Sequence, residues 1–81
     1  MKENLIYTSP DCQACRMTKM LMDAQNVSYR EIDVSVDKKS YENLIAAGHT
    51  RLPVVVTSNG VWTGFHPEKI RGLPHGKPEA T

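Results

Sequence analysis

The sequence of 81 residues is poor in cysteine, aromatic residues and long apolar runs. It contains two cysteines, one tryptophan and one phenylalanine. Its aliphatic runs are short, such as Val54-Val55-Val56, whereas a membrane-spanning helix needs roughly 18 apolar residues. Near the N-terminus, Leu5-Ile6-Tyr7 is shorter than the apolar stretch of a signal peptide. We therefore expect a cytoplasmic protein without a membrane helix.

The sequence also lacks an excess of either charge. Ten Lys and Arg residues balance nine Asp and Glu residues, so the net charge is +1. This excludes the basic stripe of a nucleic-acid-binding protein and the polybasic patch that attracts a membrane surface. With no internal repeat, the chain is expected to form one small monomeric domain, residues 1–73. Residues 74–81 are rich in proline and glycine and are predicted to form a flexible tail.

Periodicity predicts seven secondary-structure elements. Strands are expected over residues 3–8, 27–34 and 53–57, and a fourth strand is expected to begin at Val61-Trp62. The turn Asn59-Gly60 indicates a hairpin between the last two strands. Helices are expected after Pro10-Asp11, over residues 38–47, and from Pro67 through Ile70.

The order β-α-β-α-β-β-α predicts an α/β fold with a four-stranded mixed sheet and helices on both faces. The apolar face of the first helix is expected to contain Ala14, Met17, Leu21 and Ala24, and that of the second helix Tyr41, Leu44 and Ile45. Methionines after the first residue are expected in the core.

The two cysteines occur together as Cys12-Gln13-Ala14-Cys15, between the first strand and the first helix. If Cys12 is the helix N-cap, the unpaired N–H groups of the first turn and the helix dipole favour its thiolate. Cys15 follows on the same face with fewer free N–H groups nearby. The spacing predicts that Cys12 attacks a substrate disulfide and that Cys15 resolves the mixed disulfide.

The cysteine pair has two alternative functions, a structural disulfide and a zinc site. A structural disulfide across so short a loop gives little stabilisation and is unusual in the cytoplasm. A zinc site normally needs a second pair of ligands, but His49, His66 and His75 are not paired at a zinc-binding spacing. Redox chemistry is therefore favoured, with no metal and no bound cofactor.

Three motifs together carry a resemblance to a known family: "YTSPDCQAC", "RLPVVV" and "WTGFHPEKI". They resemble the thioredoxin fold and, within it, the NrdH-redoxins, glutaredoxin-like electron donors of class Ib ribonucleotide reductase. The resemblance extends from about Leu5 to Leu73. It implies a dithiol-disulfide oxidoreductase whose electrons come from NADPH through thioredoxin reductase and pass to the large subunit of ribonucleotide reductase or to another disulfide protein.

The resemblance also implies roles for individual residues. Cys12 is the attacking thiol and Cys15 the resolving thiol. Leu52-Pro53 corresponds to the family's cis peptide bond, and Gly64 to the glycine that lets a bound peptide approach the backbone. Trp62 and Phe65 either form an exposed platform for a partner or pack in the core.

The sequence departs from the family pattern at two places. His66 replaces the usual arginine of "GFRP", which makes the block a candidate for pH sensitivity. Gln13-Ala14 differs from the family's intervening dipeptide. The alternative function is a glutathione-dependent dithiol glutaredoxin, but the chain has "TGFHP" where glutaredoxins carry polar groups that hold glutathione.

Overall fold

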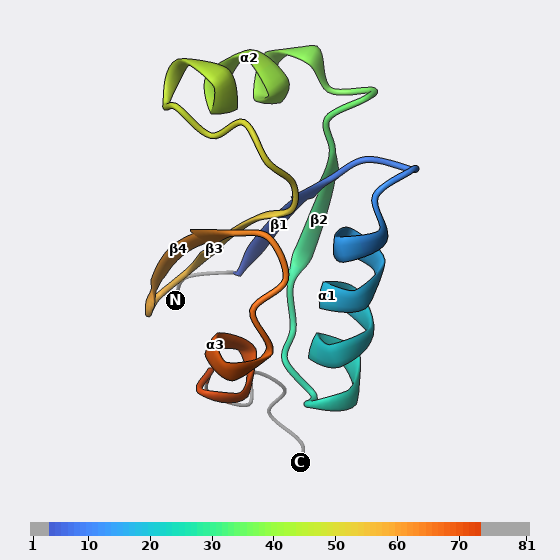
Figure 1. The fold of residues 1–81 in the computed structure, drawn as a ribbon, viewed down its shortest axis with the longest axis vertical. Coiled ribbons are helices and arrows are strands. Elements are labelled where there is room, and N and C mark those ends of the chain that lie inside the picture. Colours follow the sequence, from blue (N-terminus) through green and yellow to red (C-terminus); the bar gives the residue numbers. More distant parts are fainter. Residues whose placement is uncertain (1–3, 74–81) are drawn as a thin grey trace.

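A computed structural model describes residues 4–73 of the chain (Figure 1). The elements in order are β1 (Leu5–Thr8), α1 (Gln13–Ala24), β2 (Arg30–Asp33), α2 (Lys38–Ala46), β3 (Val54–Thr57), β4 (Gly60–Thr63) and α3 (Pro67–Arg71). The predicted order β-α-β-α-β-β-α is confirmed. The predicted tail, residues 74–81, lies outside the described residues.

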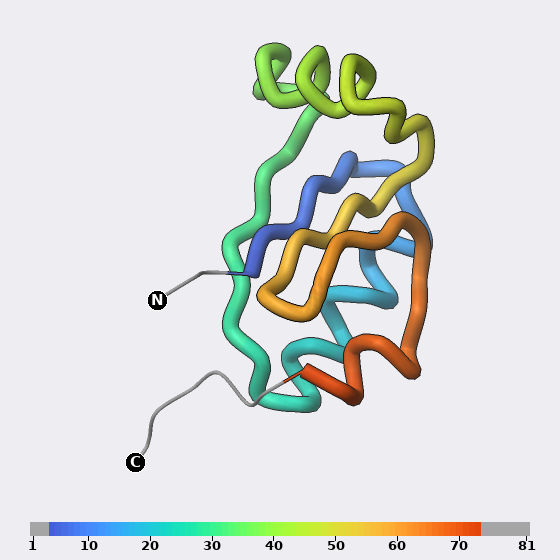
Figure 2. The backbone as a smooth tube through the Cα atoms, turned by 90° about the vertical axis from the view of Figure 1, so that its left-hand side faces the viewer, coloured from blue at the N-terminus to red at the C-terminus, as the bar shows by residue number. Residues whose placement is uncertain are grey.

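The four strands form one mixed sheet in the order β2-β1-β3-β4 (Figure 2). β1 pairs with β2 in parallel, β3 runs antiparallel to β1, and β4 runs antiparallel to β3. The first βαβ unit therefore places β2 at one edge, and the hairpin at Ser58-Asn59 places β4 at the other. The start of β3 lies at the same end of the sheet as the carboxyl end of β1, because the two strands are antiparallel.

The larger core lies between the sheet and helices α1 and α3. Its buried residues, all at most 8% exposed, are Ile6, Met22, Val27, Val55, Trp62, Ile70 and Leu73. The buried side chains of α1 are Cys15, Thr18 and Met22. The face predicted from Ala14, Met17, Leu21 and Ala24 is therefore wrong by about one residue: the helix turns its cysteine and threonine inward, whereas Met17 and Met20 are 42% and 69% exposed.

A smaller core lies on the other face of the sheet. Leu44 of α2 packs there with Val34 and Val54, and partly buried residues of the strands and of the loop before β3 complete the cluster. Tyr41 and Ile45 are 51% and 45% exposed. Of the predicted apolar stripe of α2, Leu44 is therefore the residue that is buried. Figure 1 shows the reason, since α2 lies beyond the end of the sheet, apart from α1 and α3.

The predicted boundaries agree with the observed ones or differ by up to three residues. The second strand begins at Arg30 because Val27 takes part in the turn that closes α1, where its N–H donates to the Met22 carbonyl at 2.9 Å. α3 extends one residue beyond Ile70. Within residues 4–73, none of the helices combines the length and apolar character needed to cross a membrane.

Candidate active site

The cysteine pair lies where the chain leaves β1 and begins α1. Cys12 is the N-cap of α1, with extended backbone angles, and its Sγ accepts a hydrogen bond from the Cys15 N–H at 3.1 Å. The two cysteines are joined by a disulfide, with their Cα atoms 5.2 Å apart. The N-cap position predicted for Cys12 is confirmed. A sulfur at this position faces a backbone donor at the positive end of the helix dipole, which favours a thiolate once the disulfide is reduced.

The two sulfurs differ in their exposure. Cys12 is half-buried, whereas Cys15 is 1% exposed and faces the core side of α1. A second protein can therefore approach Cys12 but not Cys15. Arg16 follows Cys15 in the sequence, but its guanidinium donates to the Gln13 side chain at 2.9 Å rather than to a sulfur.

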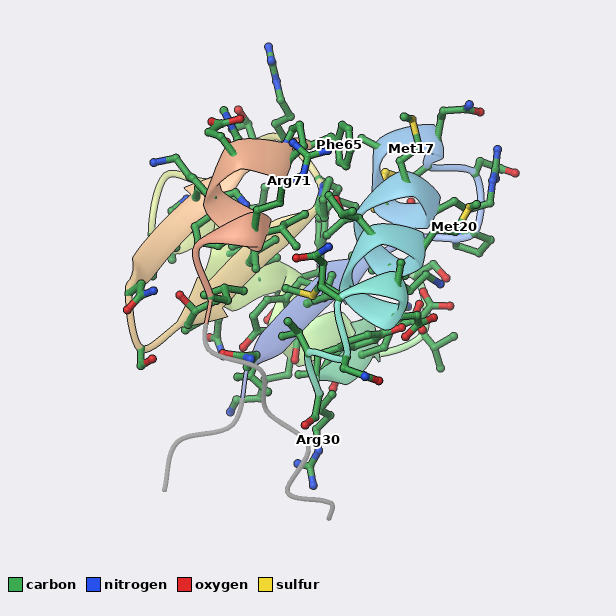
Figure 3. All side chains as sticks on the ribbon, turned by 90° about the horizontal axis from the view of Figure 1, so that it is seen from below. Met17, Met20, Arg30, Phe65 and Arg71 are labelled. Atoms are coloured by element: carbon green, nitrogen blue, oxygen red, sulfur yellow. A yellow bond between two sulfur atoms is a disulfide. The ribbon has the colours of Figure 1, made fainter. Side chains whose placement is uncertain are left out.

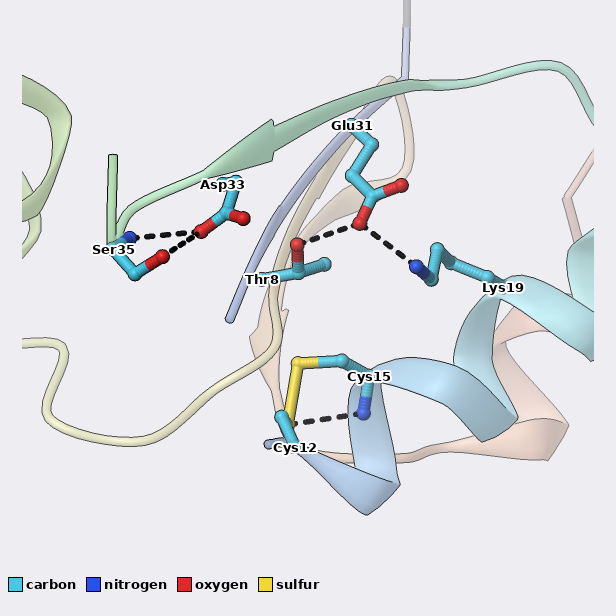
Figure 4. A network of polar contacts seen from close by, with 7 residues as sticks. All are labelled: Thr8, Cys12, Cys15, Lys19, Glu31, Asp33 and Ser35. Carbon is cyan, nitrogen blue, oxygen red and sulfur yellow. Dashed lines mark hydrogen bonds and ion pairs between the residues drawn. A yellow bond between two sulfur atoms is a disulfide. The ribbon is translucent and has the colours of Figure 1, made fainter. Parts of the chain in front are cut away.

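A polar network beneath this turn was missed from the sequence (Figure 4). The buried Thr8 hydroxyl donates to Glu31 Oε2 at 2.8 Å, and Lys19 Nζ donates to the same oxygen at 2.8 Å. Lys19 follows Cys15 by four residues, so both lie on one side of α1. The hydrogen bond from Lys19 is the main cause that lowers the pKa of Glu31, and the Thr8 hydroxyl adds to it.

This network joins α1 to β1 and β2 next to the cysteine turn. Its signals in the sequence were the four-residue spacing from Cys15 to Lys19 and an acidic residue in the second strand. Neither signal showed that the two charges meet, because they lie on different elements and 12 residues apart.

A second site feature forms where β3 begins and β4 ends. The Leu52-Pro53 peptide bond is cis, Pro53 is buried, and the Gly64 N–H donates to the Pro53 carbonyl at 2.9 Å. Gly64 has φ of +84°, a conformation that side-chain-bearing residues rarely adopt. We call Leu52, Pro53 and Gly64 the Pro53–Gly64 strip.

The sheet register brings this strip to the cysteine end of the molecule. Tyr7 of β1 pairs with Val54 of β3, so Pro53 follows one step beyond this pair, next to Thr8. Thr63 pairs with Val54 from the other side, which sets Gly64 against Pro53. The strip thus lies at the same end of the sheet as the cysteine turn, which follows the carboxyl end of β1.

The backbone of Arg51 and Leu52 makes no backbone hydrogen bond to any other described residue. The side chain of Leu52 is half-buried against the smaller core. Unpaired backbone groups just before β3, at the end of the sheet where the cysteine turn lies, are suited to pairing with an extended peptide.

The two aromatic candidates have different environments. Trp62 is 8% exposed and belongs to the larger core, so its burial favours the core-packing alternative that the sequence left open. Its indole N–H has no hydrogen-bond partner among the described residues, and the Lys69 ammonium lies 5.9 Å from the ring centre. Phe65 is half-buried against the same core and keeps part of its ring accessible (Figure 3).

His66 lies in the loop between Gly64 and α3, and its ring contacts residues on both sides of this loop. Its Nε2 lies 3.0 Å from the Thr63 carbonyl oxygen, and its Nδ1 lies 3.2 Å from a carboxylate oxygen of Glu68. Both partners are acceptors, so each contact requires an N–H on the ring nitrogen that faces it. The pKa of Glu68 is lowered chiefly by its own backbone N–H and further by the His66 side chain.

Within residues 4–73, no three side chains of His, Cys, Asp or Glu gather closely enough to hold a metal ion. His49 and His66 therefore do not join the cysteines in one cluster, and His75 lies outside the described residues.

Comparisons with known proteins place the chain in a family. Residues 4–62 match the family model described as Glutaredoxin. The chain is 37% identical over 75 residues to the glutaredoxin-like protein NrdH of Escherichia coli strain K12, covering 93% of this chain and 91% of that protein. The corresponding protein of Salmonella typhimurium is 33% identical over the same coverage.

A similar fold is found among solved structures. The structure of the glutaredoxin-like protein NrdH-redoxin from Escherichia coli, which is described as having a thioredoxin-like activity profile, matches with a TM-score of 0.84 and 35% identity over 90% of this chain and 97% of that chain. A thioredoxin-like protein matches with a TM-score of 0.74 and 33% identity, covering 85% of this chain and 96% of its own. The four-stranded sheet and three helices are thus a thioredoxin-like fold, and the chain belongs to the glutaredoxin family as an NrdH-redoxin-like thiol-disulfide oxidoreductase.

Proposed function

We propose that this protein is a cytoplasmic, monomeric dithiol carrier that takes electrons from thioredoxin reductase and reduces a protein disulfide, with class Ib ribonucleotide reductase as the acceptor. The observation that carries the proposal is the asymmetry of the two sulfurs. Cys12 is accessible and hydrogen-bonded at a helix N-cap, whereas Cys15 is 1% exposed. Such a pair suits a nucleophile that meets a partner and a second thiol that works inside the protein.

The reaction proceeds through two exchanges. The Cys12 thiolate attacks one sulfur of the target disulfide, so that a mixed disulfide forms and the other target sulfur leaves as a thiolate. The Cys15 thiolate then attacks Cys12 Sγ, forms the Cys12–Cys15 disulfide and releases the second target sulfur. Two electrons pass to the target, whose thiolates take up two protons from water. The reductase reverses the sequence, with electrons that come ultimately from NADPH and no cofactor held in this chain.

The Pro53–Gly64 strip is proposed to hold the target segment during this exchange. The backbone N–H and C=O of Leu52 are free to hydrogen-bond with a target segment. The Gly64 N–H is bonded to the Pro53 carbonyl, and Gly64 has no side chain that would keep the segment away. The accessible part of Phe65 adds an apolar contact for the partner. Trp62 supports the strip from within the core, and His66 holds the loop that follows Gly64.

The match to the glutaredoxin family model supports glutathione as the second candidate reductant. The same chemistry at Cys12 and Cys15 accepts electrons from either source, since the fold does not determine the partner.

The deciding experiment measures NADPH consumption while the protein reduces a model disulfide in two separate reactions. One reaction contains thioredoxin reductase, and the other contains glutathione and glutathione reductase. The proposal expects turnover with thioredoxin reductase and little with glutathione. Turnover with glutathione alone would show a glutaredoxin instead. Reduction of the ribonucleotide reductase large subunit, followed by deoxyribonucleotide formation, then tests the acceptor.

A further inference from the structure

Arg51 lies beside the Pro53–Gly64 strip. A Cβ atom added to Gly64 would lie 3.9 Å from Cδ of Arg51, so the stem of this arginine runs along the Gly64 backbone. Arg51 precedes the cis Leu52-Pro53 bond, and its side chain is exposed. The guanidinium therefore lies close to the backbone that is proposed to receive the target segment.

The charge of Arg51 has no partner among residues 4–73, where it forms neither an ion pair nor a hydrogen bond. Other cations near the site are engaged. Arg16 donates to Gln13, Lys19 is paired with Glu31, and Lys69 lies over the Trp62 ring. An arginine with all its N–H groups free is suited to bind a carboxylate through two parallel hydrogen bonds.

The charges along this end of the sheet are also separated. β2 ends at Asp33, and Asp37 caps the helix that follows. The carboxylates of these two residues accept hydrogen bonds from Ser35 and Ser40, which keeps both at the β2 side. The strand order is β2-β1-β3-β4, and Arg51 precedes β3. Arg51 and these two acids therefore lie on opposite sides of β1, the strand that leads to the cysteine turn. A segment crossing this end therefore meets the carboxylates of Asp33 and Asp37 on the β2 side and the Arg51 guanidinium on the β3 side, with the exposed Asp11 next to Cys12.

We propose that Arg51 is a specificity-determining residue that binds the carboxylate of an Asp or Glu close to the reacting cysteine in the partner's disulfide segment. This inference rests on the proposed function, because it assumes that the segment lies along the Pro53–Gly64 strip. The partner is thus an acidic disulfide-bearing protein segment. The carboxylates of glutathione are the competing source of the same chemistry.

The test uses pre-reduced full-length protein and fluorogenic peptides that each contain one disulfide. The peptides carry Glu, Gln or Lys two residues before or two residues after the reacting cysteine. For one of these two positions, we expect the wild-type protein to reduce the Glu peptide about three- to tenfold faster than the Gln peptide, as for a partly exposed bidentate ion pair. Arg51→Gln equalises the two rates, Arg51→Glu favours the Lys peptide, and added salt reduces the preference of the wild type.

Arg16→Gln is the matched control, since it removes an exposed arginine next to Cys15 that already has a partner. The proposal is overturned if the wild type shows no preference at either position, or if Arg16→Gln abolishes the preference as fully as Arg51→Gln. It is also overturned if Arg51→Gln slows the reduction of glutathione disulfide while the Glu preference remains. Reduction of the Gln peptide at equal rates by the wild type and Arg51→Gln shows that disulfide reduction itself is intact. Failure to reduce any peptide would instead contradict the proposed function.

Discussion

The cysteine turn and the Pro53–Gly64 strip lie at the same end of the sheet, but they are built in different ways. The cysteine turn consists of consecutive residues, and the hydrogen bond that prepares Cys12 comes from Cys15, three residues away. The strip joins Pro53 to Gly64 through a hairpin, and its position depends on the pairing of β3 with both neighbours. Reactivity is thus a local property of this chain, whereas recognition depends on its tertiary structure.

This difference suggests a division between the effects of mutations. Changes in the cysteine turn should stop electron transfer without unfolding the protein. Changes in the strip should leave the cysteine chemistry available but weaken the approach of the target.

Replacement of either cysteine should have the largest effect. Cys12→Ser removes the nucleophile, so the rate of disulfide reduction should fall by about 10³-fold or more. Cys15→Ser should still attack but should accumulate a mixed disulfide with the target, visible by mass spectrometry and released by dithiothreitol. Free release of the target by Cys15→Ser at the wild-type rate would contradict the assigned roles.

Gly64→Ala should affect recognition. The space around Gly64 permits a methyl group, because the nearest side-chain atoms would be 3.9 Å away, but φ of +84° is unfavourable for alanine by about 1–2 kcal/mol. We expect the apparent KM for a disulfide peptide to rise about tenfold, because the methyl group and any backbone shift disturb the strip. Gly60→Ala is the control, since Gly60 has φ of +129° with nothing within 4 Å and lies at the start of β4, next to the hairpin turn. Equal kinetic losses in both variants would argue against the strip.

Glu31→Gln should produce a stability loss that depends on pH. The pKa of Glu31 is lowered in the folded protein, so its ionised form stabilises the fold above the unfolded pKa of about 4.3. This stabilisation is lost as the pH falls through the lower folded value. Because the pair is partly exposed, we expect a difference in the free energy of unfolding of about 1 kcal/mol at neutral pH, which shrinks as the pH falls below the unfolded pKa of about 4.3.

Denaturant unfolding of the wild type and Glu31→Gln across this pH range measures the effect. Glu42→Gln is the control, since Glu42 is exposed on α2. A difference that stays constant with pH would show that the charge of Glu31 is not what stabilises the fold.

His66→Gln should have the smallest effect. The contacts of His66 with Thr63 and Glu68 are partly exposed, and an exposed ion pair contributes little. We expect less than about 0.5 kcal/mol of stability and less than about a twofold change in the rate of peptide reduction. A change of tenfold or more, with Glu68→Gln giving the same change, would make the His66–Glu68 contact part of target recognition.

The sequence was most informative where structure is determined by neighbouring residues. The hairpin indicated by Asn59-Gly60, the proline at the start of α3 and the cysteine at the start of α1 were all predicted from local chemistry, and the hairpin turn itself is Ser58-Asn59. The predicted face of α1 is wrong by about one residue because the spacing of apolar residues gives no weight to a threonine whose hydroxyl can bond within the helix. In the structure, Thr18 is fully buried because its hydroxyl donates to the Ala14 carbonyl at 2.8 Å, which satisfies it without solvent, and Met20 is exposed instead.

The order of the elements and the redox pair could be predicted without the structure, because both depend on short-range chemistry. A helix start, a hairpin turn and a Cys-x-x-Cys turn are each built from a few consecutive residues. The tertiary structure alone decided that Trp62 faces inward, that Glu31 meets Lys19 and Thr8, and that Arg51 runs along Gly64. These contacts join elements that are distant in the chain, and their formation depends on how the sheet pairs and how the helices pack against it.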